Sequence, residues 1–148
     1  MIQLTRSDEL ISQYVYLNLH DEMTGAFPTA YAPLCIFTSQ LTGKSIAVIP
    51  LSTDYSNKDR YVKIQLIPNY VVSVPVSGYF IVGNTDYPYG LYYAEIYQNS
   101  SGTNLDPDSA IKKTYTGLMN LTQSGNPAVT YTEYTTNDSD TESVYITN

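Results

Sequence analysis

Residues 61–66 read Tyr61-Val62-Lys63-Ile64-Gln65-Leu66. Apolar side chains at positions 62, 64 and 66 alternate with polar or amphipathic ones, which is typical of a β-strand with one buried face. An amphipathic helix would repeat its apolar positions every three or four residues instead. The stretch therefore predicts a strand whose Val62, Ile64 and Leu66 point toward a core.

Similar short segments recur along the chain, separated by turn residues. Leu41-Thr42-Gly43-Lys44 joins two of them and predicts a hairpin. The segment 71–76 contains Pro75, which favours an edge strand or an extended connection. The other predicted strands cover 14–19, 34–37, 46–49, 78–83, 87–97, 115–119, 129–134 and 144–146.

About eight or nine short strands at this spacing predict an all-β protein. We expect an antiparallel β-sandwich, jelly-roll or Ig-like, that forms a single domain over residues 1–148. At most one short helix is expected, a single turn at Ser7–Ile11, because Asp8 and Glu9 favour a helix N-terminus. The polar tail 135–148 contains the last predicted strand, which is interpreted either as a strand exchanged between copies or as one paired with a partner chain.

Charge is sparse and acidic. Only 14% of the residues are charged, and the net charge is −7. Of this, −6 falls between Gln65 and Asn148. An acidic chain without a basic patch disfavours nucleic acid as a partner. No stretch is long and apolar enough for a membrane span, and Met1–Glu9 has no signal-peptide character, so we expect synthesis in a cytoplasm.

Tyrosine dominates the aromatic residues, with 16 Tyr against 3 Phe and no Trp. Tyr combines an apolar ring with a hydroxyl and is enriched both in strands and at protein interfaces. Half-buried strand positions account for many of them, and the rest predict a contact surface. The candidate protein-interaction residues are Tyr87, Tyr89, Tyr92, Tyr93, Tyr97, Tyr131 and Tyr134.

Catalytic and metal-binding patterns are missing from the sequence. His20 is the only histidine and Cys35 the only cysteine, so a Cys–His or Ser–His pair has one available base, in an acidic turn. Cys35 lies in an apolar run and is expected to be a buried thiol. Glu95 is read as a strand carboxylate that faces solvent or a partner rather than as a glycosidase acid. Residues 138–142 carry carboxylates at alternate positions, as the start of a calcium-binding loop does. An ordinary acidic turn is the competing interpretation of this segment. We expect no enzyme activity and no cofactor.

A series of strand and turn motifs carries a family resemblance. In order, they are Met1–Thr5, Tyr16–Leu19, Ile36–Ser39, Ile49–Ser52, Arg60-Tyr61, Gly90–Gln98 and Asn104–Pro107. This order resembles a family of small structural proteins of tailed bacteriophages, especially phages of Bacteroidota and of the crAss-like group. The resemblance spans most of the first 120 residues. Family members then usually show a Glu-x-Gly, and here Tyr115 stands in place of the acid before Gly117.

The resemblance implies a role in the virion and no catalytic residues. The expected partners are other virion proteins, such as major capsid, portal or tail proteins, with the chain present in many symmetric copies. Capsid decoration, a neck ring at the portal and a tail or fibre adaptor are all compatible with it. The competing hypothesis is a carbohydrate-binding adhesin in which Tyr87, Tyr89, Tyr92 and Tyr93 stack on sugars.

Overall fold

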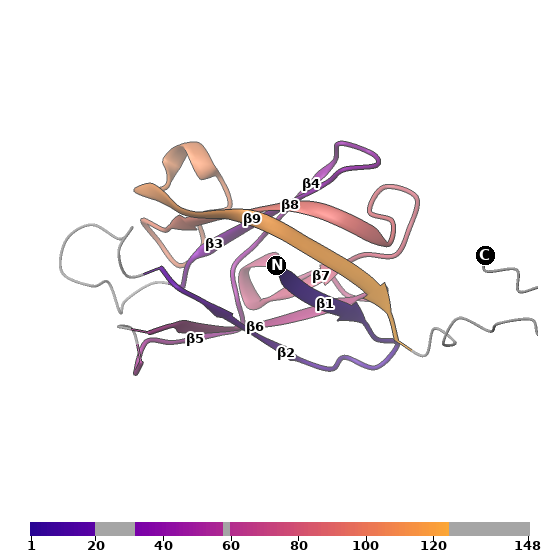
Figure 1. Ribbon diagram of the computed structural model, residues 1–148, viewed down its shortest axis with the longest axis horizontal. Coiled ribbons are helices and arrows are strands. Elements are labelled where there is room, and N and C mark those ends of the chain that lie inside the picture. Colours follow the sequence, from indigo (N-terminus) through magenta and orange to yellow (C-terminus); the bar gives the residue numbers. More distant parts are fainter. Residues whose placement is uncertain (20–31, 58–59, 125–148) are drawn as a thin grey trace, which may run out of the picture.

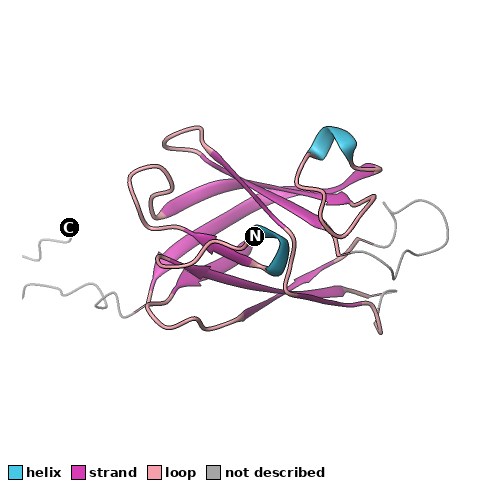
Figure 2. Ribbon diagram, turned by 180° about the vertical axis from the view of Figure 1, so that it is seen from behind, coloured by secondary structure: helices cyan, strands magenta, loops and turns pink. Residues whose placement is uncertain are grey.

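A computed structural model of the chain describes residues 1–19, 32–57 and 60–124 (Figure 1). Within these residues it contains nine strands and two single-turn 3-10 helices, at Pro75–Ser77 and Pro107–Ser109 (Figure 2). The strands are β1 (Ile2–Arg6), β2 (Gln13–Leu17), β3 (Leu34–Ser39), β4 (Ser45–Val48), β5 (Ser52–Asp54), β6 (Val62–Asn69), β7 (Tyr79–Ile81), β8 (Gly90–Gln98) and β9 (Lys112–Gln123).

The strands form two layers that enclose one main core (Figure 1). The first sheet has the order β1-β9-β8-β3-β4, and the second has the order β2-β6-β5, with β7 also paired to β6. The prediction of an all-β sandwich is confirmed. Pairing is not uniformly antiparallel, because β1 runs parallel to β9 and β7 runs parallel to β6.

The core follows from the alternation in the strands. Val62, Ile64 and Leu66 are fully buried, as the opening stretch predicts. On β8 the inward positions hold Tyr92, Ala94 and Ile96, which are also fully buried. Phe37 of β3 and Phe80 of β7 stack between the layers, with ring centroids 5.9 Å apart. Cys35 is buried as expected, and burial raises the pKa of its thiol, which keeps the thiol protonated.

One local prediction is wrong, and for another the structure selects one of its two alternatives. Ser7–Ile11 is not helical, because the hydroxyl of buried Ser7 accepts the Glu9 amide in a tight turn at 3.2 Å, where the chain crosses between the layers. The segment 71–76 is a connection between β6 and β7 rather than an edge strand. Its first amides bond to the Asn69 side chain, and Pro75 then opens a 3-10 helix.

Other differences concern short elements. Sequence reasoning did not propose β1 or β5 as strands, and five and three residues carry little periodic signal. The hairpin predicted at Leu41–Lys44 is present between β3 and β4. The strands predicted at 129–134 and 144–146, and the tail 135–148, lie outside the described residues.

The turn before β7 predicts a strong effect of Gly78→Ala. Gly78 has φ +80°, and a Cβ there would lie 2.5 Å from the Leu51 amide nitrogen and 3.2 Å from the Gln65 carbonyl oxygen. The variant should lose more than the about 1–2 kcal/mol that a positive φ alone costs a residue with a Cβ. Gly43→Ala is the matched control, because Gly43 has φ +72° and open space around the added methyl group. Urea unfolding of both variants measures the difference, and equal losses would contradict the steric argument.

Burial of Tyr92 predicts a loss of stability at alkaline pH. Its hydroxyl donates to the Pro88 carbonyl oxygen at 2.5 Å, and desolvation raises its pKa from 10.0 to about 12. Since the unfolded chain releases this proton first, the stabilisation is complete below pH 10 and is lost as the pH rises toward 12. At pH 11 the loss should be about 1 kcal/mol for this residue. Tyr92→Phe should flatten the fall in unfolding free energy between pH 9.5 and 11.5, and an unchanged slope would contradict the assignment.

Candidate interaction surfaces

The outer face of the first sheet exposes an apolar row. Tyr93 on β8 lies directly opposite Leu118 on β9, and Leu91 lies two residues before Tyr93 on the same side of β8. Their exposed fractions are 44% for Leu91, 55% for Tyr93 and 37% for Leu118. Side chains this exposed on paired positions form one contiguous surface. We call these three residues the Tyr93 face.

One border of the Tyr93 face is a neutralised ion pair. Lys113 of β9 bonds to a Glu95 carboxylate oxygen, and Glu95 also accepts the Tyr97 hydroxyl at 3.2 Å. The Lys113 ammonium lies 5.6 Å from the centroid of the Tyr97 ring. The hydrogen bond to Glu95 raises the pKa of Lys113, which favours the protonated ammonium. Glu95 is therefore occupied by a strand neighbour, with its side chain 31% exposed.

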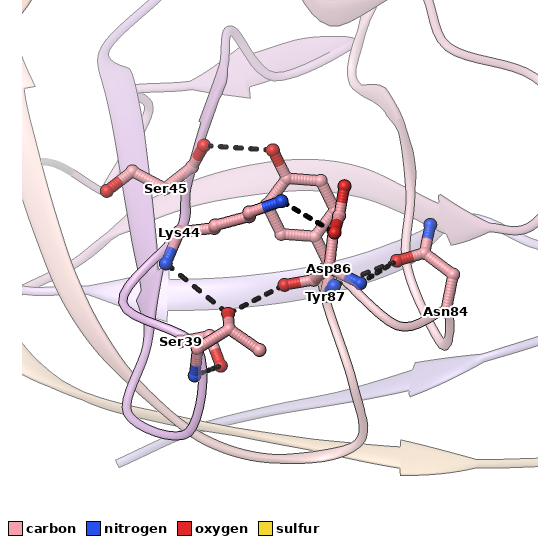
Figure 3. A network of polar contacts seen from close by, with 7 residues as sticks. Ser39, Lys44, Ser45, Asn84, Asp86 and Tyr87 are labelled. Carbon is pink, nitrogen blue, oxygen red and sulfur yellow. Dashed lines mark hydrogen bonds and ion pairs between the residues drawn. The ribbon is translucent and has the colours of Figure 1, made fainter.

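A second border is a turn held by polar contacts (Figure 3). The Lys44 ammonium bonds to an Asp86 carboxylate oxygen at 2.6 Å, and the Thr42 hydroxyl donates to the Asp86 carbonyl oxygen at 2.7 Å. The Gln40 amide donates to the carbonyl oxygen of Leu91 at 3.1 Å, which joins this turn to β8. These contacts fix the β3–β4 turn, in which Leu41 is 79% exposed. A protruding apolar residue on a well-held turn suits contact with a partner.

The loop opposite that turn is fixed by its own side chains (Figure 3). Asn84 accepts the backbone amides of Asp86 at 3.1 Å and Tyr87 at 2.8 Å, which closes an Asx turn. The Tyr87 hydroxyl donates to the Ser45 carbonyl oxygen on β4 at 3.3 Å. Tyr87 thus packs on the core from one side and holds the edge of β4 with its hydroxyl.

The other Tyr residues predicted to contact a partner are not all at the surface. Tyr92 is fully buried and offers no surface to a partner, which corrects its place among the interaction candidates. It points inward because it shares a side of β8 with Ala94 and Ile96. Tyr89 is partly buried against the core, and Tyr97 is half-buried against a small second cluster that includes Leu34 and Ile36 of β3. Tyr131 and Tyr134 lie outside the described residues.

Tyr89 belongs to an aromatic clamp around Arg6. The Arg6 guanidinium lies 4.9 Å from the centroid of the Tyr70 ring and 5.3 Å from that of Tyr89, and it bonds to Asp8 at 3.2 Å. The arrangement fastens the end of β1 to two loops by cation–π contacts. We read it as a structural contact, because only 13% of the Arg6 side chain is exposed.

A second aromatic surface lies on the outer face of the other sheet. Tyr14 and Tyr16 of β2 are 51% and 58% exposed. Lys63 lies over the Tyr14 ring at 4.3 Å, and Tyr16 meets Tyr61 edge-to-face at 5.2 Å. Sequence reasoning did not select these residues, although a signal was present. Once Val15 and Leu17 point inward, their neighbours on the strand must point outward.

A groove opens beside β2, between the two sheets. It has a volume of about 320 Å³ and is lined mainly by the first residues of β1, by β2 and by Tyr115 of β9. Its lining contains no Asp, Glu, Lys or Arg side chain. The groove is therefore a tyrosine-rich recess without charged side chains at the open side of the sandwich.

Chemical sites are not evident in the part of the chain that the structure describes. Within it, no three His, Cys, Asp or Glu side chains gather as metal ligands would. None of the helices in these ranges has the length and apolar character to cross a membrane. His20 and residues 138–142 are outside the described residues. Comparison with protein-family models, curated proteins and solved structures finds no match.

Proposed function

We propose that this chain is a structural protein of a tailed-bacteriophage virion that binds other virion proteins in many symmetric copies. Capsid decoration and a head–tail neck ring are the two positions that suit a small β-sandwich of this kind. The proposal starts from the order of motifs, with Gly90–Gln98 as the strongest of them. It gains support from the surface that this same segment carries.

The observation that carries the proposal is the Tyr93 face. An apolar and aromatic row on the outer side of a sheet, flanked by internally paired charges, has the composition of an interface centre. Among the sequence-predicted interaction residues that the structure describes, Tyr93 is the one that is more than half exposed, at 55%. The neighbouring pairs Lys113–Glu95 and Lys44–Asp86 add no net charge that a partner would have to neutralise.

Mass spectrometry of purified virions tests the proposal. The protein should be a stoichiometric component of particles of the phage that encodes it. A phage that carries Tyr93→Ser should yield particles depleted of the protein. Val71→Ser, which changes an apolar residue that is 60% exposed and lies away from this face, should leave its content unchanged. Absence of the wild-type protein from particles would overturn the proposal.

A carbohydrate-binding adhesin is the second candidate, favoured by the accessible rings of Tyr93, Tyr14 and Tyr16. Exposed aromatic rings provide stacking platforms for sugars. A glycan array with the soluble chain separates the two functions. Saturable binding that Tyr93→Ser or Tyr14→Ser abolishes would favour the adhesin. A protein that is present in virions but binds no glycan on the array would favour the structural role.

A further inference from the structure

We draw no further inference here: the strongest candidate, the tyrosine-rich groove between β1 and the edge of β2, carries nothing because nothing in the structure shows what covers it, and the chain continues from β2 into residues 20–31, which lie outside the described ranges.

Discussion

Replacing Asn69 with Asp should lower the free energy of unfolding by about 3 kcal/mol or more, because it places a carboxylate among carbonyl oxygens. Asn69 is fully buried at the end of β6. Its Oδ1 accepts the amides of Val71 at 2.8 Å and Val72 at 2.7 Å. Its Nδ2 lies 3.1 Å from the Ile67 carbonyl oxygen, 3.0 Å from that of Val72 and 3.4 Å from that of Phe80. Asp keeps the acceptor and loses every donor.

The same substitution at Asn84 is the matched control. Asn84 also closes an Asx turn by accepting two backbone amides, but it is exposed, and only its oxygen takes part in that turn. Asn84→Asp keeps those acceptors and should change stability by less than about 0.5 kcal/mol. Guanidinium unfolding at pH 7 compares the two variants. Similar losses of unfolding free energy in both variants would show that the hydrogen bonds donated by the Asn69 amide group contribute little to stability.

Phe80→Ala should cost about 3–5 kcal/mol of unfolding free energy, a large part of the total for a domain of this size. Phe80 has no exposed surface and stacks on Phe37, which is also fully buried. The two rings come from strands of different sheets, so their removal opens the space between the layers. If the neighbouring residues cannot move into that space, a cavity remains. Its cost adds to the transfer free energy lost with the Phe80 ring.

Thermal and chemical unfolding of Phe80→Ala, Phe37→Ala and the double variant measure the pair. Since the rings share one contact, the double variant should lose less than the two single losses added together. Phe80→Leu nearly conserves the apolar volume and should lose less than about 1.5 kcal/mol. Strict additivity of the two alanine substitutions would contradict direct coupling of the rings.

Alternation in the sequence predicts most of the sandwich, and the reasons for the exceptions are local. In β8 and in the first half of β6 one side chain in two is buried, so the pattern is visible without any partner. β1 is defined largely by its pairing with β9, and its five residues become a strand only in that context. At Ser7–Ile11 and 71–76, side-chain hydrogen bonds from Ser7 and Asn69 override the propensities of the acidic and β-branched residues.

Interaction residues are harder to predict, because Tyr suits both a core and a surface. Of the Tyr cluster at 87–97, Tyr93 is exposed and Tyr92 is buried, and the two differ only in strand parity. Because the small and aliphatic residues Ala94 and Ile96 mark the inward side of the strand, the sequence alone predicts that Tyr92 points inward and Tyr93 outward. The hydroxyl of Tyr87 at the β4 edge and the stacking of Arg6 on Tyr89 join segments that are distant in sequence. No local pattern predicts such contacts.

The parallel pairing of β1 with β9 also affects how fast the chain can fold. Thr5 and Thr122 bond across this pair at 3.1 Å, at a sequence separation of 117. During synthesis β1 emerges first and must wait for β9 before the first sheet can close. Pairings at such sequence separation are slow, because chain closure is opposed by entropy until late contacts form. Until then, the apolar side chains of β1 and the edge of β8 remain open to other nascent chains.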